Sequence, residues 1–145
     1  MYKHLLIATD GSELADKAVT HGLALAKALG AKVTTVTVSE PWTNFLTGEV
    51  GATFPVEEYE QAAESNASAI LAAVAKRAEA AGVSCEKRYV KDQFPAEGIL
   101  EAAEEGSCDL IVMASHGRTG VQRLLLGSQA NKVVTHSKVP VLICR

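Results

Sequence analysis

Residues 113–128 have the sequence MASHGRTGVQRLLLGS, and the rest of the chain is organised around this stretch. It follows the apolar run DLIVM at residues 109–113, which is typical of a parallel strand buried on both faces. Small or flexible residues come next: Ala114, Ser115, Gly117, Thr119 and Gly120. Such a backbone can curl tightly, direct successive N–H groups into one concavity and let an anion approach closely. The stretch therefore predicts a phosphate-binding loop.

The stretch ends in Gly127-Ser128, which predicts the start of a helix. The free N–H groups and the positive dipole end of that helix would face the same concavity as the loop. Ordinary turn glycines and a capping serine are the simpler structural interpretation of these residues. The spacing favours an anion site, because nine residues separate Gly117 from Gly127 and a hydroxyl follows Gly127 directly.

This spacing resembles the motif of the universal stress protein family. Nucleotide-binding members of that family carry glycine, two residues, glycine, nine residues, glycine and then Ser or Thr. The chain carries Ala114, Ser115-His116, Gly117, nine residues and Gly127-Ser128. Alanine therefore replaces the first glycine of the motif, and the other motif positions are intact.

The resemblance also covers ATD at residues 8–10 and KVPVLI at residues 138–143, so it spans essentially the whole chain. It implies an adenine nucleotide alpha hydrolase-like fold and a homodimeric stress-response module that binds ATP, or a related adenine nucleotide, with Mg²⁺. The family also contains members that bind no nucleotide and act through protein partners, and this alternative stays open. The implied nucleotide-binding positions are Ala8, Thr9, Asp10, Val38, Met113, Ala114, Ser115, His116, Gly117, Arg118, Thr119, Gly120, Gly127, Ser128, Gln129 and Ala130.

Hydrophobic periodicity predicts strands that alternate with helices along the chain. The expected strands are residues 4–8, 32–38, 84–90, 109–113 and 139–144, and the expected helices are residues 12–29, 56–81, a segment starting at Pro95, and 128–137. This alternation implies one doubly wound α/β domain over residues 1–145, with a parallel sheet covered by helices on both faces. The resemblance implies the strand order 3-2-1-4-5, whose switch point lies between the first and fourth strands. Asp10 and the Gly117 loop would then face each other.

The periodic apolar positions also predict which helix faces are buried. In the helix at residues 56–81 these positions are Tyr59, Ala63, Ala67, Ile70, Val74 and Ala78. In the last helix they are Ala130, Val133 and Val134. Residues 39–55 form a long connection to which we assign no chemistry.

The composition excludes several other classes of protein. The 14 basic and 17 acidic residues give a net charge of −3 with both signs scattered, which argues against a nucleic-acid partner or an anionic membrane surface. Three separated cysteines, Cys85, Cys108 and Cys144, indicate buried reduced thiols rather than a disulfide or metal site. No apolar run approaches the roughly 20 residues of a membrane span, and the N-terminus shows no secretion signal. We therefore expect a soluble cytoplasmic protein.

Asp10 is the candidate partner for a ribose hydroxyl or for a magnesium ion on the nucleotide, as the matching family position implies. Asp is also a leading N-cap residue, so capping of the first helix is the alternative role. Val38 matches the family position whose backbone meets the adenine, and its role rests on the resemblance alone. Ala114 decides whether a nucleotide can bind. Its methyl group obstructs the ligand if the position needs a positive φ or a backbone contact, and is harmless if the position only has to be small.

The sequence does not predict an ordinary enzyme. His116 could donate to a phosphate, but no Ser, Cys or carboxylate is spaced to complete a triad with it. The Walker sequence GxxxxGK[ST] and a GxGxxG motif after the first strand are absent, which excludes P-loop kinases and Rossmann dehydrogenases. We expect at most slow ATP hydrolysis.

The final strand predicts a dimer. Residues 139–144, VPVLIC, lie at the edge of the sheet in the implied strand order, where unpaired N–H and C=O groups favour pairing with another strand. Pro140 withholds one donor but only at the start of the strand. We expect a homodimer with a two-fold axis, which is also the dimer that the resemblance implies. Its interface would contain Val139, Val141, Leu142 and Ile143.

Overall fold

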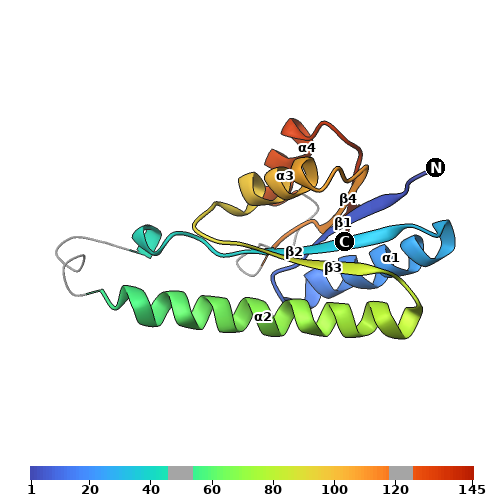
Figure 1. Cartoon of the computed structure of the whole chain (residues 1–145). Coiled ribbons are helices and arrows are strands. Elements are labelled where there is room, and N and C mark those ends of the chain that lie inside the picture. The colour runs from blue at the N-terminus through green and yellow to red at the C-terminus, as the bar shows by residue number, and fades with distance from the viewer. Residues whose placement is uncertain (46–53, 118–125) are drawn as a thin grey trace.

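The computed structural model describes residues 1–45, 54–117 and 126–145. These residues form a five-stranded parallel sheet in the order β3-β2-β1-β4-β5, which confirms the predicted order (Figure 1). The strands are β1 (His4–Ala8), β2 (Lys32–Val38), β3 (Cys85–Val90), β4 (Leu110–Ala114) and β5 (Val141–Cys144). The helices are α1 (Glu13–Leu29), α2 (Val56–Ala81), α3 (Pro95–Glu105) and α4 (Ser128–His136), and a short 3-10 helix, η1, spans Trp42–Phe45. In the described part of the chain, no helix combines the length and apolarity needed to span a bilayer.

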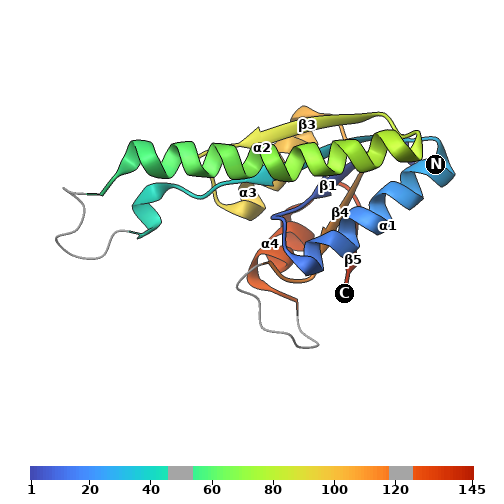
Figure 2. The same ribbon diagram turned by 90° about the horizontal axis from the view of Figure 1, so that it is seen from below.

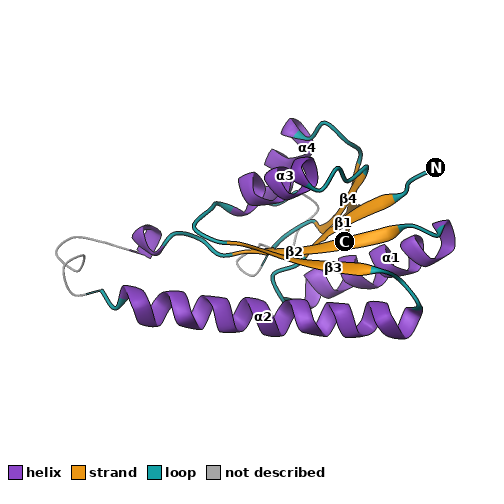
Figure 3. Cartoon of the chain, viewed as in Figure 1, coloured by secondary structure: helices purple, strands orange, loops and turns teal. Residues whose placement is uncertain are grey.

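Helices cover both faces of the sheet. α1 and α2 lie on one face, and α3 and α4 lie on the other (Figures 1 and 3). The winding changes direction between β1 and β4, which are paired neighbours with Leu5 opposite Leu110. Because the chain leaves these two strands toward opposite faces, their carboxyl ends form the edge at which open α/β sheets bind ligands.

The central strand β1 is buried along its whole length. Its alternate side chains point to opposite faces, so Leu5 and Ile7 join the core cluster beneath α1 and α2, whereas Leu6 joins the cluster beneath α3 and α4. In β4, Val112 lies in the first cluster and Ile111 in the second. Burial on both faces explains why these strands are continuous apolar runs rather than alternating ones.

β4 is shifted by one residue from the predicted strand at residues 109–113. Asp109 precedes the strand, and its carboxylate accepts hydrogen bonds from the backbone N–H groups of Lys3 and His4 at 2.8 and 3.1 Å. These bonds tie the start of β4 to the start of β1. The strand continues through Ala114, so the first position of the glycine motif belongs to the sheet.

The sequence predicts a final strand that begins at Val139, but β5 begins at Val141. Pro140 has no N–H to donate, although its carbonyl accepts from the Ile111 N–H at 3.0 Å. Before it, the Ser137 hydroxyl group donates to the Val139 carbonyl at 2.7 Å and accepts from the Val139 N–H at 3.1 Å. Val139 is therefore held by a local turn, whereas Pro140 is bonded to β4 through its carbonyl.

Helix burial differs from the prediction at four residues: Tyr59, Ala63 and Ile70 of α2 are half-buried, and Val134 of α4 is exposed. Val134 of α4 is 44% exposed, although it was expected in the core. In α2, Leu71 is buried where the pattern favoured Ile70. The first turns of α2 extend past the sheet (Figure 2), so Tyr59 lies outside the core and its hydroxyl donates to the Glu40 carbonyl at 2.9 Å. The apolar spacing of α2 continues beyond the part of the helix that the sheet can cover.

His4 is a buried titratable residue at the start of β1. It is 6% exposed, and its Nε2 lies 2.8 Å from Thr34 Oγ1. Burial lowers the pKa of the His4 imidazole below its ordinary value, and the positive charge of Lys32 lowers it further. The carboxylates of Glu86 and Asp109 act in the opposite direction but do not reverse the shift. The folded chain therefore keeps His4 neutral at pH values at which the unfolded chain binds a proton.

We expect acid to destabilise the fold through His4. An unfolded histidine titrates at about pH 6.5. The contribution of neutral His4 to the free energy of unfolding is therefore fully present above that pH, and it decreases as the pH falls toward the lowered pKa of the folded state. Denaturant titrations on both sides of about pH 6.5 measure this decrease. The His4→Gln variant should show a shallower slope. An NMR titration of the folded wild-type protein in which the His4 ring has a midpoint at or above about 6.5 would contradict the expectation.

Candidate functional site

A tight turn follows the carboxyl end of β1. The Thr9 N–H donates to the Val36 carbonyl at 3.0 Å, which continues the pairing with β2. The Thr9 hydroxyl group accepts from the Gly11 N–H at 3.1 Å, and Asp10 Oδ1 accepts from the Ser12 N–H at 2.9 Å. Gly11 has a φ of 80°, which glycine adopts without steric cost. These bonds fix the half-buried Asp10 side chain at the edge of the sheet.

Helix α1 is capped by Ser12, whose Oγ accepts from the Ala15 N–H at 3.2 Å. The alternative role for Asp10, capping of the first helix, is therefore wrong. The Asp10 carboxylate instead orders the turn that precedes the cap. Its Oδ1 serves the turn, whereas its Oδ2 lies beside Gly117 of the β4 loop.

Ala114 occupies a regular strand position. It is 7% exposed and lies opposite Cys144 of β5. Among the non-glycine residues that the structure describes, positive φ occurs at Asp92 and Ser107 and not at Ala114. The alanine that replaces the first motif glycine therefore carries no backbone strain. The position does not need a positive φ, so this obstacle to nucleotide binding does not arise.

Ser115 connects the end of β4 to both neighbouring segments. Its N–H donates to the Cys144 carbonyl at 2.9 Å, and its carbonyl accepts from the Gly127 N–H at 2.8 Å. Its hydroxyl oxygen lies 3.1 Å from His116 Nδ1. A Cβ atom on Gly127 would lie 2.8 Å from the Ser115 carbonyl oxygen and 3.2 Å from His116 Cδ2. Glycine is required at position 127 because two backbone segments meet there.

Gly117 brings the β4 loop against the β1 turn. A Cβ atom on Gly117 would lie 3.1 Å from Asp10 Oδ2, which is closer than ordinary van der Waals contact. The strand order predicts that Asp10 and this loop face each other, and the structure brings them together. Arg118, Thr119 and Gly120, which were also expected at the ligand, lie outside the described residues.

Helix α4 begins directly after Gly127, which is its N-cap and offers no side-chain acceptor. The simpler interpretation of Ser128 as the capping residue is therefore wrong. Ser128 is instead the exposed first residue of the helix. The N–H groups of a first helical turn lack acceptors within the helix, and the helix dipole makes this end positive. The start of α4 is thus suited to an anion, as the sequence predicts.

Gln129 has a structural contact that the sequence did not predict. Its Oε1 accepts a hydrogen bond from the Ala96 N–H of α3 at 3.0 Å. Helix α3 needs this acceptor, because Phe94 at its N-cap supplies none and Pro95 has no N–H. The only signal in the sequence is the lack of a Ser, Thr, Asp or Asn before Pro95, which indicates that a cap must come from elsewhere.

The remaining predicted positions lie near the same edge with their side chains in the core. Ala8, Met113 and Ala130 are 7%, 6% and 3% exposed, so they could offer a ligand little more than backbone groups. Val38 ends β2, and its side chain packs on α3: a Cβ atom on Gly98 would lie 2.7 Å from Val38 Cγ2. These residues shape the edge of the sheet rather than project from it.

Residues 1–145 match the Universal stress protein family. The chain belongs to this family. A universal stress protein of Thermus aquaticus is 36% identical over 145 residues, with 100% of both chains covered. The solved structure of MJ0577, a universal stress protein of Methanocaldococcus jannaschii, has a TM-score of 0.84 at 29% identity and covers 99% of this chain and 96% of its own. A solved universal stress protein in complex with cAMP has a TM-score of 0.72 at 29% identity, covering 99% and 97%.

The described residues of this universal stress protein contain no group of three or more His, Cys, Asp or Glu side chains that could hold a metal ion. Asp10 is the carboxylate at the carboxyl edge of β1. Mg²⁺ needs about six oxygen ligands and is commonly held by one or two carboxylates together with substrate phosphates and water. The Asp10 carboxylate alone is therefore not a complete set of ligands for a magnesium ion.

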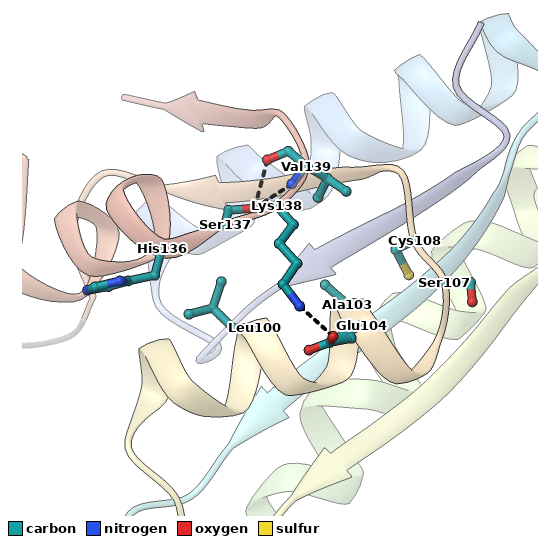
Figure 4. A pocket seen from close by; sticks show the side chains of 9 residues that line it. All are labelled: Leu100, Ala103, Glu104, Ser107, Cys108, His136, Ser137, Lys138 and Val139. Carbon is teal, nitrogen blue, oxygen red and sulfur yellow. Dashed lines mark hydrogen bonds and ion pairs between the residues drawn. The ribbon is translucent and has the colours of Figure 1, made fainter.

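A cavity of about 200 Å³ lies away from this edge, between the C-terminal ends of α3 and α4 (Figure 4). Lys138 Nζ and Glu104 Oε1 form an ion pair beside it at a distance of 2.7 Å. Burial raises the pKa of the Cys108 thiol in its lining to about 11, so this thiol stays protonated at neutral pH. The Cys108 thiol is therefore not an activated nucleophile, and we assign the cavity no part in the site at the carboxyl edge of β1 and β4.

We predict that Gly127→Ala destabilises the fold by about 1–3 kcal/mol, because the new methyl group would force apart two backbone segments. Chemical denaturation measures the loss. Gly127→Ser is the matched variant, since serine is a favourable N-cap residue but carries the same Cβ atom. Both variants should lose similar stability. Full stability of Gly127→Ser would show that capping preference, rather than close approach, requires glycine at this position.

Proposed function

We propose that the chain binds an adenine nucleotide, ATP with Mg²⁺, at the edge formed by β1, β4 and α4, and that it acts in the cytoplasm as a nucleotide-dependent stress regulator. The observation that carries this proposal is the close approach of Gly117 to Asp10 Oδ2. It places the glycine-rich segment after β4, which is suited to phosphate, beside a carboxylate that is suited to a ribose hydroxyl or a magnesium ion. The relative in complex with cAMP, at 29% identity, supports an adenine nucleotide as the ligand.

Each part of the edge has a role in this proposal. The first turn of α4 and the Ser128 hydroxyl group donate to phosphate oxygens. Asp10 accepts from a ribose hydroxyl or binds the magnesium ion, and the backbone at Val38 meets the adenine. The Mg²⁺ ion neutralises part of the polyphosphate charge. Ala114 is compatible with these contacts because it remains in regular strand geometry.

The proposed role is regulatory rather than catalytic. His116, in the glycine-rich segment after β4, is a residue of the type that can act as a general base. Its Nδ1 already forms a hydrogen bond with the Ser115 hydroxyl group at 3.1 Å. Neither residue of this pair is a carboxylate, so the pair alone is not a catalytic triad. Turnover of ATP should therefore be far slower than the roughly 1–100 per second of kinases.

We predict that isothermal titration calorimetry detects Mg²⁺-ATP binding to the wild-type protein. Gly117→Val should abolish measurable binding because its side chain would displace Asp10 Oδ2, and Ser128→Leu should do the same by removing a donor at the start of α4. A fall of at least tenfold in affinity, equal to about 1.4 kcal/mol, is the smallest loss that agrees with this expectation. The absence of heat and of a thermal shift at high ATP concentration in the wild-type protein would overturn the proposal.

Two further variants sharpen this experiment. Asp10→Asn keeps an oxygen that can accept from the Ser12 N–H but removes the negative charge, so it should reduce the gain in affinity that Mg²⁺ provides. Glu101→Gln is the control, because Glu101 is exposed on α3 and outside the site. It should bind as the wild-type protein does. If Gly117→Val and Ser128→Leu lose thermal stability in proportion to their loss of binding, these residues have a structural role instead.

The alternative is a dimer that binds no nucleotide and acts through protein partners. Mass spectrometry of the freshly purified and then denatured protein distinguishes the two. Co-purified adenine nucleotide in molar proportion supports the binding site. A nucleotide-free protein that also gives no calorimetric signal favours the alternative.

We further propose that the protein is a homodimer through β5. This strand lies at the edge of the sheet, and Leu142 is 39% exposed on it. Val134 of α4 is 44% exposed. Val139, Val141 and Ile143 are partly buried against the core cluster under α3 and α4. Pairing of two copies across this edge would satisfy the outer N–H and C=O groups of each strand and cover its apolar side chains.

Light scattering at micromolar concentration should give twice the chain mass of 15.3 kDa. Leu142→Lys with Val134→Lys should produce a monomer, because both side chains are exposed and can be changed without entering the core. Val141→Lys with Ile143→Lys is a less selective variant, since these side chains also pack against the core. A wild-type mass near 15.3 kDa would refute the dimer, and a dimer that survives both exposed substitutions would place the interface elsewhere.

A further inference from the structure

Phe94 is an exposed aromatic residue at the start of α3. It is 45% exposed and occupies the N-cap position with φ −74° and ψ 147°. Ser, Thr, Asp and Asn are preferred at this position because their side chains accept from the first turn, which phenylalanine cannot do. Within the described residues, the ring contacts join Trp42 to Phe54 and Phe54 to Tyr59, and they do not include Phe94. Neither helix capping nor aromatic packing accounts for this side chain.

Two hydrogen bonds place Phe94 between two parts of the proposed nucleotide site. On one side, the Gln93 N–H donates to the Ser39 carbonyl at 3.2 Å, immediately after the end of β2. On the other side, the Ala96 N–H donates to Gln129 Oε1 at 3.0 Å, in the first turn of α4. The segment that carries Phe94 is thus attached both to the strand end expected at the nucleobase and to the helix end expected at the phosphates.

The start of α3 also packs against the end of β2. A Cβ atom on Gly98 would lie 2.7 and 2.9 Å from the two methyl carbons of Val38, so the helix backbone packs directly on this side chain. The Gly98 N–H donates to the Phe94 carbonyl at 2.9 Å and begins the helix. Phe94 is therefore presented from a backbone fixed at three points rather than from a free loop.

We propose that Phe94 is a specificity-determining residue whose ring stacks on the nucleobase of the bound nucleotide. This inference rests on the proposed nucleotide site and names its base-side wall. A ligand whose phosphates lie at the start of α4 and whose base reaches Val38 passes the start of α3. Stacking on an exposed ring buries apolar area from both partners and needs no hydrogen-bond donor, so it raises the affinity for the base-bearing ligand over the bare sugar phosphate.

Calorimetry with two probes tests the inference. Phe94→Ala should weaken Mg²⁺-ATP binding about tenfold, the effect of losing one base–aromatic stack. It should leave the affinity for ribose 5-triphosphate, which lacks the base, unchanged. Phe94→Tyr keeps an aromatic face and should bind ATP as the wild-type protein does. Equal ATP affinity in Phe94→Ala and the wild-type protein would overturn the inference, and so would an equal loss for both probes.

A fluorescence experiment gives an independent readout. The chain has one tryptophan, so Trp42→Phe combined with Phe94→Trp places the only indole at position 94. ATP should quench or shift its emission, and ribose 5-triphosphate should not. Unchanged emission at saturating ATP would show that the base does not reach position 94. A wild-type protein that binds no ATP would instead disprove the proposed function. The two failures are distinguishable, because the first appears in the wild-type titration and the second only in the comparison with the Phe94 variants.

Discussion

One backbone hydrogen bond, from the Gly127 N–H to the Ser115 carbonyl at 2.8 Å, closes the connection between β4 and α4. This bond places the positive end of α4 beside the residues that follow β4. It needs glycine at position 127, because a side chain there would collide with the same carbonyl. Gly117 adds the second close approach, to Asp10 of the β1 turn. The site is therefore defined by two close approaches: a Cβ atom does not fit at Gly127, and one at Gly117 would crowd the Asp10 carboxylate.

The sheet supplies the platform for these contacts. β1 and β4 are buried neighbours from which the chain leaves toward opposite faces, so their carboxyl ends carry the Asp10 turn and the glycine loop side by side. The two helices of the second face are joined at their N-terminal ends by Gln129 and Ala96, which links the expected phosphate end of the site to α3. Membership of the universal stress protein family agrees with this arrangement along the whole chain.

Local sequence predicted the features that depend on local physics. The continuous apolar run at residues 4–8 and the glycine after residue 29 set the limits of β1 and α1, because burial and a left-handed C-cap need only the residues themselves. The features it missed depend on distant partners. Gln129 reaches a helix end 33 positions away, and the exposure of Val134 depends on how α4 meets the sheet. Asp10 does not cap α1, as the alternative interpretation held, because Ser12 occupies the cap position.

We propose that the nucleotide binds at this carboxyl edge and at no other surface. Titration of ¹⁵N-labelled protein with Mg²⁺-ATP tests it most directly, because each backbone N–H reports on its own surroundings. We expect the amide signals of residues 10–12, 115–117 and 127–130 to shift together and saturate, while those of residues 3–5 at the opposite end of β1 stay in place. Shifts that gather around the cavity between the C-terminal ends of α3 and α4, or no shifts at all, would contradict it.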